Sequence, residues 1–455
     1  MEAHRTRVLE RETMMDTVNT DVLILGGGLA GLSAAYHLGT CDWRLIEAES
    51  TVGGLARTDV VDGFSFDWTG HWFHARDPQM RARIEQEWLP GNLVTVERRA
   101  IIYSQNVVTR FPYQINMHGL PPETVSQCVL GFMEANFGEG GRALRDRPPA
   151  NSAEFALRHL GRGICERFLF PYNTKLFTVP PEELSAEWGG RFVPRPSLTQ
   201  VVRGALGLED DGAGYNATFW YPREGGIESL PRALASRLNK NCVHTGRRVT
   251  AIDPARREVR LDDGASIHYR SLISTLPLKR LCELWSAPTD ALRAAAEKLR
   301  SVSVTTVELG VRGSPKRSFH WCYFPESTLP FYRAGSPSQV HTSLAPQGTH
   351  SFAVEFSHRG PVDGASLVRQ AIEGLAANGF LEAKEVVLAR SRTIPTAYVL
   401  FDQAYAEARK TVLDAAARAG IALAGRYGLW EYSSMEDALL TGRTAALNIL
   451  SSRAA

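Results

Sequence analysis

Three glycines and an acid near the start of the chain have the spacing of a dinucleotide site. Gly26, Gly28 and Gly31 form the pattern G-x-G-x-x-G, between a short apolar run that ends at Leu25 and a helical pattern. The first glycine permits a tight turn, the second lets a pyrophosphate approach the backbone, and the third lets the helix pack against the strand. Glu47, at the end of the next expected strand, is placed to accept hydrogen bonds from a ribose. The pattern predicts dinucleotide binding; a glycine-rich turn without a ligand is the alternative.

A second glycine pair follows Glu47 and indicates which dinucleotide binds. Gly53-Gly54-Leu55-Ala56-Arg57 completes a pattern Glu-x(5)-Gly-Gly-x-x-Arg, which resembles the extended fingerprint of the amine oxidase and protoporphyrinogen oxidase superfamily of flavoproteins. Near the other end of the chain, a short strand runs into Gly425-Arg426, and a helical pattern over 437–446 follows. This resembles the closing flavin segment of that superfamily. The resemblance implies that FAD is the cofactor and that the two ends of the chain meet at it.

The same resemblance implies a set of residues that contact FAD. They are Gly26, Gly28, Leu29, Ala30, Gly31, Glu47, Ala48, Gly53, Gly54, Leu55, Arg57, Val249, Gly425, Arg426, Tyr432 and Met435. Arg57 would lie along the pyrophosphate, and the backbone of Val249 would reach the adenine. A simple turn at the end of a strand is the alternative for Gly425.

Six further blocks, taken in order, resemble UDP-galactopyranose mutase, and its eukaryotic-type branch more than the short bacterial enzymes. They lie at 69–74, 110–116, 171–180, 215–227, 323–333 and 425–435. The resemblance extends from about Asp21 to about Leu450, which is nearly the whole chain.

The resemblance implies a redox-neutral isomerisation of a nucleotide sugar. The flavin is first reduced, with NADPH or NADH as the expected reductant. Its N5 atom then attacks the anomeric carbon of the sugar and displaces the nucleoside diphosphate. The sugar ring opens and closes again as a furanose, and the diphosphate returns. The cofactor therefore acts as a covalent nucleophile in its reduced form.

Three residues match positions that this reaction needs. Arg333 matches the arginine that binds the diphosphate, for which a planar and permanently charged guanidinium is suited; a surface arginine that stabilises a loop is the alternative. Tyr432 matches a tyrosine that donates to the diphosphate, against a tyrosine packed in the core. His71 matches the histidine beside the flavin, where an imidazole can hydrogen-bond near the reactive nitrogen; a histidine with only a structural role is the alternative.

Other expected substrate contacts depart from the family pattern. A second diphosphate arginine is expected after Trp188, but the matching position is Phe192, so that Arg191 or Arg195 would have to serve. Tyr398 is the candidate for a displaced family tyrosine. The remaining candidates from matching blocks are Asn173, Phe177, where the family has tryptophan, and Tyr332. These departures leave the mutase reaction in place but open the identity of the sugar: UDP-galactopyranose or a related NDP-sugar.

The elements that must position these residues form an α/β fold in several parts. We expect a disordered N-terminal extension over 1–20 and a discontinuous, Rossmann-like FAD-binding domain over 21–100, 222–285 and 400–450. A largely helical insertion with substrate contacts is expected over 101–221, where apolar residues recur at helical spacing. Alternating patterns at 303–311 and 351–356 predict a second, substrate-binding β-sheet domain over 286–399.

Composition narrows the possible partners. The 455 residues include 51 Lys and Arg and 49 Asp and Glu, and no basic run stands out, which argues against nucleic acid as a partner. The six cysteines have no spacing typical of a metal site. No apolar run is long enough to span a membrane, and the first twenty residues lack the apolar stretch of a secretory signal. The sequence therefore predicts a cytoplasmic protein without a metal or membrane partner.

Two other functions compete with the mutase. One is a true oxidase or desaturase of the amine oxidase or protoporphyrinogen oxidase type, because one fold hosts several chemistries. Arg333 together with Tyr432 discriminates against it, since a diphosphate clamp would have no role in an amine oxidase. The other is a binding or scaffold protein that holds no flavin.

Overall fold

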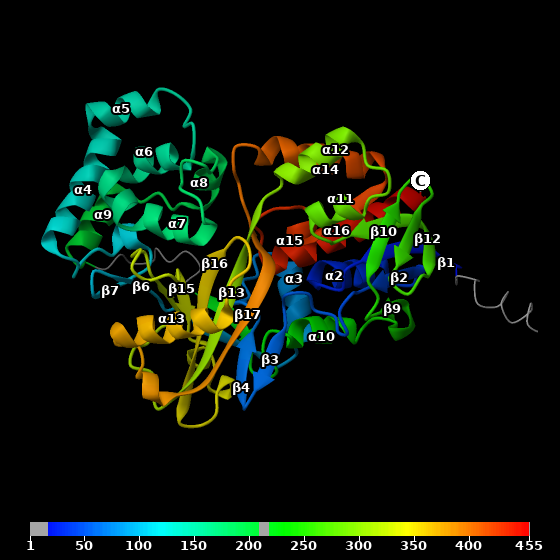
Figure 1. Cartoon of the computed structure of the whole chain (residues 1–455), viewed down its shortest axis with the longest axis horizontal. Coiled ribbons are helices and arrows are strands. Elements are labelled where there is room, and N and C mark those ends of the chain that lie inside the picture. Colours follow the sequence, from blue (N-terminus) through cyan, green and yellow to red (C-terminus); the bar gives the residue numbers. More distant parts are fainter. Residues whose placement is uncertain (1–16, 209–217, 455) are drawn as a thin grey trace, which may run out of the picture.

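The computed structural model describes residues 17–208 and 218–454, which form two large sheets and a layer of helices (Figure 1). The first sheet has the strand order β10-β11-β12-β1-β2-β9, and β18 also pairs with β12. Its strands are β1 (Thr17–Leu25), β2 (Trp43–Ile46), β9 (Val243–His244), β10 (Val249–Asp253), β11 (Glu258–Leu261), β12 (Ser266–Ser274) and β18 (Ile421–Leu423). Strand β1 is parallel to both of its neighbours, and Val22–Leu25 are completely buried. A parallel strand that is covered on both faces is apolar where it is buried, as Val22–Leu25 are, whereas the first part of β1, Thr17–Asp21, is mostly polar.

Two helices from opposite ends of the chain pack together beside this sheet. They are α2 (Leu29–Leu38) and α16 (Met435–Ala454). The Ser33 hydroxyl on α2 donates to the carbonyl oxygen of Leu439 on α16 at 2.6 Å. A Cβ atom at Gly442 would lie only 2.1 Å from the carbonyl oxygen of Ala30. This close approach needs glycine and brings the C-terminal helix to the first glycine turn.

The second sheet has the order β17-β13-β16-β15-β14-β6-β7. Its strands are β6 (Ala100–Ser104), β7 (Val107–Arg110), β13 (Ser301–Arg312), β14 (Trp321–Tyr323), β15 (Arg333–Gly335), β16 (Thr349–His358) and β17 (Val386–Val399). Helix α13 (Gly364–Ala377) lies across this sheet (Figure 1), and its Ala371 and Leu375 pack with Val307 and Leu309 of β13. Two strand pairs stand apart: β3 (Thr58–Val61) with β4 (Phe64–Asp67), and β5 (Leu93–Glu97) with β8 (Thr218–Pro222).

The helical layer lies next to the second sheet, at the upper left of Figure 1. It contains α4 (Pro122–Phe137), α5 (Glu139–Arg145), α6 (Ser152–Ile164), α7 (Phe170–Phe177), α8 (Ala186–Phe192) and α9 (Leu198–Ala205). Helices α4 and α6 approach closely through glycine, because a Cβ atom at Gly163 would lie 2.3 Å from the carbonyl oxygen of Gln127. The other helices are α3 (Pro78–Arg83), α10 (Ser229–Ala235), α11 (Leu278–Leu284), α12 (Asp290–Lys298), α14 (Tyr405–Arg418) and α15 (Gly425–Gly428).

The mixed α/β fold is confirmed, but parts of it differ from the expectation. Strand β1 begins at Thr17, because Thr17–Thr20 pair in register with Ser266–Tyr269; the predicted disordered extension 1–20 is wrong for 17–20, and 1–16 lie outside the described residues. The segment 101–221, which is predicted to be largely helical, also contains most of β6 and all of β7. Strand β6 joins the second sheet because Ala100–Ile102 pair with Trp321–Tyr323. Among the described helices, none combines the length and the apolar character needed to cross a lipid bilayer.

Candidate active site

The turn between β1 and α2 has the geometry that its glycines predict. Gly26 has a φ of +99°, and a Cβ atom at Gly31 would lie 1.9 Å from the carbonyl oxygen of Gly26. Helix α2 therefore starts against that carbonyl only because residue 31 is glycine. Gly28 is the N-cap of α2 and has no side chain to cap the first turn. The N–H groups of that turn are suited to an anionic ligand.

The second glycine turn packs against the first, backbone to backbone. The N–H of Gly53 donates to the carbonyl oxygen of Gly27 at 2.8 Å, and a Cβ atom at Gly54 would lie 3.0 Å from the Cα of Gly28. The buried carboxylate of Glu47 accepts from the N–H of Gly27 at 2.7 Å and from that of Glu49 at 2.8 Å. Bare backbone from two turns and an acid thus meet at the end of β1, and this arrangement fits the pyrophosphate and ribose of a dinucleotide.

Arg57 is buried beside these turns and is engaged by protein groups. Its Nη2 donates to the carbonyl oxygen of Thr51, and its guanidinium lies 5.0 Å from the ring centre of Trp68. These contacts secure the loop that holds Gly53 and Gly54. Contact of Arg57 with a pyrophosphate stays a prediction, as does contact of the buried Val249 with an adenine.

The C-terminal segment closes this part of the site. Gly425 has a φ of +81°, and its N–H donates to the Thr441 hydroxyl at 3.0 Å. A Cβ atom at Gly425 would lie 2.9 Å from that of Ala30, in the first turn of α2. The next residue, Arg426, donates to the carbonyl oxygen of Ser433 at 2.8 Å, and its guanidinium lies 4.5 Å from the ring centre of Tyr432. The two ends of the chain therefore meet at one place, as the resemblance implies.

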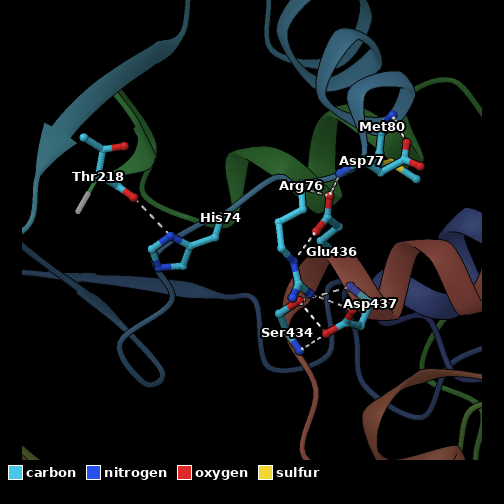
Figure 2. Close-up of polar contacts among 8 residues, drawn as sticks. All are labelled: His74, Arg76, Asp77, Met80, Thr218, Ser434, Glu436 and Asp437. Atoms are coloured by element: carbon cyan, nitrogen blue, oxygen red, sulfur yellow. Dashed lines mark hydrogen bonds and ion pairs between the residues drawn. The ribbon is translucent and has the colours of Figure 1, made fainter. Parts of the chain in front are cut away.

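The loop that carries His71 is fastened to the first turn of α16 (Figure 2). The Glu436 carboxylate, 1% exposed, accepts from the N–H of Arg76 at 2.6 Å and from that of Asp77 at 2.7 Å. The Arg76 guanidinium also reaches Glu436 and, at 3.1 Å, Asp437. Further back in the loop, His74 donates to the carbonyl oxygen of Thr218 at 3.1 Å. This loop and the start of α16 therefore form one connected unit.

His71 is held by its own loop and faces two arginines. Its Nδ1–H donates to the carbonyl oxygen of Thr69 at 3.0 Å. Burial, with the nearby charges of Arg426 and Arg333, lowers the pKa of His71 to about 4. The imidazole is therefore neutral at neutral pH and adds no charge to a site that already holds two guanidinium groups.

Arg333 is fixed in place by a buried carboxylate. Its Nε and Nη2 donate to the two oxygens of Glu355 at 3.0 and 2.9 Å, and the Tyr332 hydroxyl donates to the same carboxylate. Burial opposes the charge of Arg333, but Glu355 and neighbouring tyrosines outweigh it and raise the pKa of the guanidinium. One face of the guanidinium lies on the indole of Trp321, 4.0 Å from the ring centre. Arg333 therefore stays charged and oriented.

Aromatic residues from three elements gather around Arg333. Its Nη2 donates to the Tyr398 hydroxyl at 3.4 Å, and the Tyr398 and Tyr432 rings stack with centres 5.9 Å apart. Phe177, from α7, meets the edge of Tyr398 at 6.4 Å, and Trp188 meets Tyr432 at 5.5 Å. The structure thus brings together Arg333, Tyr398, Tyr432 and Phe177, which the sequence analysis names separately.

Three residues of this cluster have no role in the sequence analysis. Glu355 orients Arg333 and supplies the only acid among the apolar residues 352–356, a pattern that could have marked it. Trp321 fits between two glycines: a Cβ atom at Gly70 would lie 1.7 Å from its indole, and one at Gly335 would lie 3.1 Å away. Tyr172 lies within 5.5 Å of Tyr323, ring centre to ring centre.

The other substrate candidates have different surroundings. Asn173 is buried on α7, beside Tyr172. Tyr332 is fully buried behind Arg333, with its hydroxyl bound to Glu355. Arg195 is exposed and lies over the ring of Phe155 at 5.0 Å. Arg191 belongs to α8, and its side chain lies outside the described part of the structure.

Proteins with similar sequences include a porphyrinogen oxidase and a carotenoid desaturase. The chain is 26% identical over 315 residues to coproporphyrinogen III oxidase of Mycobacterium leprae. This match covers 63% of this chain and 66% of that protein. The match thus spans slightly less than two thirds of that relative. A shorter stretch of 62 residues is 42% identical to carotenoid 3,4-desaturase of Haloarcula japonica. This stretch covers 13% of this chain and 12% of that protein.

Solved structures include a mutase with a very similar fold. Reduced UDP-galactopyranose mutase superposes with a TM-score of 0.88 and 27% identity, over 95% of this chain and 94% of that one. A putative protoporphyrinogen oxidase from Exiguobacterium sp. 255-15 superposes with a TM-score of 0.72 and 18% identity, over 96% and 99%. The family model described as flavin containing amine oxidoreductase matches residues 29–450. The chain therefore belongs to the flavin containing amine oxidoreductase family.

Proposed function

We propose that this flavoprotein is a mutase that interconverts the pyranose and furanose forms of a nucleotide sugar, with no net redox change. The observation that carries the proposal is the fixed and charged Arg333 beside the hydroxyl of Tyr398 and the ring of Tyr432. A guanidinium and phenols suit a diphosphate that must leave and return. The likeness to the solved UDP-galactopyranose mutase supports the same function.

The cofactor of this reaction would be FAD. Its pyrophosphate would bind at the glycine turns around Gly28 and Gly53, and its ribose at Glu47, which the backbone geometry fits. When bound and reduced, by NADPH or NADH, it supplies the nucleophile for the anomeric carbon of the sugar. We assign FAD binding to 21–100, 222–285 and 400–450, and substrate binding to the insertion 101–221 and the sheet domain 286–399.

The protein groups would divide the remaining work. Arg333 holds the diphosphate, and Tyr398 and Tyr432 donate their hydroxyl groups to it. Asn173 and Phe177 border the space for the nucleoside or the sugar, and Arg191 or Arg195 supplies a second cation. His71 stays neutral and its Nδ1–H is bound to the Thr69 carbonyl oxygen, so its Nε2 can accept a hydrogen bond near the flavin without adding a charge. The substrate would be UDP-galactopyranose or a related NDP-sugar, because Phe177 replaces the tryptophan of the family.

A second candidate is an oxidase or desaturase. It is favoured by the similarity to coproporphyrinogen III oxidase over 63% of the chain. In that case the tyrosines around Arg333 would line a site for the ring system of a substrate that gives up electrons to the flavin. Arg333 and Glu355 would then have only a structural role.

An assay of the purified, dithionite-reduced protein separates the two functions. The reduced protein is incubated with a panel of NDP-pyranoses and NDP-furanoses, and the products are separated by chromatography, with the oxidised protein as the control. A mutase converts a sugar only in the reduced state and leaves the flavin reduced after many turnovers. Reduction of the oxidised flavin by coproporphyrinogen, with no sugar converted, would instead establish the oxidase.

A further inference from the structure

Helix α7 carries a lysine whose contacts the proposed reaction does not use. Lys175 Nζ donates to the carbonyl oxygens of Glu326 at 2.9 Å, Leu329 at 3.0 Å and Phe331 at 2.9 Å. An ammonium group has three N–H donors and no acceptor, so these three bonds use its full capacity. All three acceptors belong to residues 324–332, which connect β14 to β15.

The connection depends on Lys175 because both of its ends are buried, although its middle reaches the surface. Phe324 and Phe331 are completely buried, and Leu329 is nearly so. Two of its N–H groups are satisfied nearby: Phe324 donates to the carbonyl oxygen of Tyr332, and Leu329 to that of Glu326. Carbonyl groups inside a fold need donors as well, and those of the half-buried Glu326 and the buried Leu329 and Phe331 converge on Lys175. Without it, the connection would lose the group that gathers these carbonyls.

The two partners of this contact both carry parts of the substrate site. The connection leads directly into Arg333, the first residue of β15 and only two residues beyond Phe331. Helix α7 carries Asn173 and Phe177, on either side of Lys175. Lys175 therefore links α7 of the helical layer to the segment of chain that directly precedes Arg333.

We propose that Lys175 is a positioning residue that fixes α7 to the β14–β15 connection and so sets the distance between Arg333 and the substrate residues of α7. Its consequence for substrate rests on the proposed function, since only a ligand that spans α7 and Arg333 would sense that distance. The contact between α7 and the connection is a property of the fold and can be tested separately.

The test compares Lys175→Met and Lys175→Arg with the matched control Lys410→Met in the FAD-loaded protein. Lys410 pairs with Asp414 on the exposed face of α14, so its substitution removes a lysine without touching the site. Two quantities are measured: hydrogen exchange of peptides that cover 324–333, and the affinity for UDP by calorimetry.

We expect faster exchange in 324–333 for Lys175→Met, with the peptides of β1 and β2 unchanged, and about tenfold weaker binding of UDP. Lys175→Arg, which keeps the charge and several donors, should restore most of both. Lys410→Met should match the wild type. If Lys175→Met is not recovered in folded form, Lys175→Arg and Lys175→Gln carry the same comparison, with Arg the more protected of the two.

Equal exchange in 324–333 in the wild type and the variant would overturn the proposal. So would loosening that spreads equally through the first sheet, or an arginine variant as loose as the methionine variant. If the wild type fails to bind UDP, the proposed substrate class is wrong, while the exchange measurement still decides the role of Lys175.

Discussion

Arg333 is held by protein groups on several sides. Glu355 takes two of its nitrogens, Trp321 supports one face, and Tyr398 lies at its edge. A ligand that binds there does not have to order a flexible side chain, which lowers the entropic cost of binding. The planar fork of arginine is essential to this arrangement, because a lysine could not bond to both oxygens of Glu355 in the same plane.

This leads to a prediction for Arg333→Lys. The variant keeps the charge but loses the paired bonds and the stacking on Trp321, so we expect kcat/KM for the nucleotide sugar to fall about 100-fold. The flavin absorbance spectrum should stay the same, because the glycine turns are untouched. Steady-state kinetics of the reduced protein give the ratio. A variant with normal kcat/KM would show that the diphosphate binds elsewhere.

A second prediction at this scale concerns the protonation of His71. Burial and two arginines lower its pKa to about 4 in the folded protein, whereas an unfolded histidine has a pKa of about 6.5. Between these values the unfolded chain binds a proton that the folded protein does not, so the free energy of unfolding rises with pH. The stability of the wild type relative to His71→Gln should therefore increase from pH 4 to about pH 6.5 and stay constant above it.

Denaturant unfolding of both proteins over this pH range provides the measurement. The comparison with His71→Gln cancels the contributions of the carboxylates and of the other histidines to the pH dependence, because those groups titrate in both proteins. A stability difference that is flat below pH 6.5 would mean that His71 is protonated as easily in the folded protein as in the unfolded chain.

At the residue scale, the sequence predicts those site residues that lie in continuous motifs. Gly26, Gly31 and Gly425 are required by local backbone geometry, so spacing along the chain reveals them. Glu355 and Trp321 contact Arg333 from other strands of the second sheet, and no local pattern states which residues will face each other across strands. Their roles depend on strand register, which only the folded sheet provides.

At the scale of elements, the hydrogen bonds of Glu436 to Arg76 and Asp77 form a latch that joins the loop carrying His71 to α16. Glu436 is buried and accepts from two backbone N–H groups and from the Arg76 side chain, as Figure 2 shows. It joins an early loop to the last helix of the chain. Since the start of α16 is the segment expected to face the flavin, the latch would hold both sides of the cofactor site together.

We therefore predict a clear loss of stability for Glu436→Ala. Two backbone N–H groups would lose the buried carboxylate that accepts from them, which should cost about 2–4 kcal/mol of unfolding free energy and weaken FAD retention. Glu436→Gln keeps a carbonyl oxygen that can accept from both groups, so its loss should be smaller. The control is Glu85, whose partly exposed side chain pairs with that of Arg81 at 3.5 Å, and its alanine variant should change stability by less than about 0.5 kcal/mol.

Urea unfolding and flavin release during dialysis check these expectations. Equal stability of the alanine and glutamine variants would contradict the role assigned to the backbone N–H groups. If the alanine variant is destabilised but retains FAD normally, the contacts of Glu436 stabilise the fold without holding the cofactor.

Elements were predictable where their pattern is local. The strands expected at 303–311 and 351–356 lie within β13 and β16, because the pattern that predicts them is contained in each segment itself. The pattern did not place β6 and β7 in the second sheet, because β6 pairs with β14, more than 200 residues further along the chain, and β7 joins the sheet only through β6. The extension of β1 to Thr17 likewise depends on pairing with β12. Long-range pairing sets these boundaries, and polar residues take part in it without an apolar signal.

At the scale of the whole molecule, the cluster around Arg333 exists only because several parts of the chain converge. The second sheet supplies Arg333 and Tyr398, the helical layer supplies Phe177, and the C-terminal segment supplies Tyr432. Periodicity along the chain could not predict this convergence. The resemblance to a known family predicted it, because it carries over the arrangement of an entire fold.

Because these parts of the chain meet at Arg333, a ligand bound there would connect them and stabilise the folded protein. This leads to the last prediction. A nucleoside diphosphate that touches Arg333, Tyr398 and Tyr432 binds only the folded protein, so UDP at one hundred times its Kd should stabilise it by about 2.7 kcal/mol. Thermal unfolding of the FAD-loaded protein should show a Tm that rises with UDP concentration, and Arg333→Ala should abolish the shift. Coproporphyrin III, which lacks a diphosphate, should leave the Tm unchanged. If the porphyrin stabilises the protein and UDP does not, the aromatic cluster serves a flat substrate, and the oxidase becomes the better account of this site.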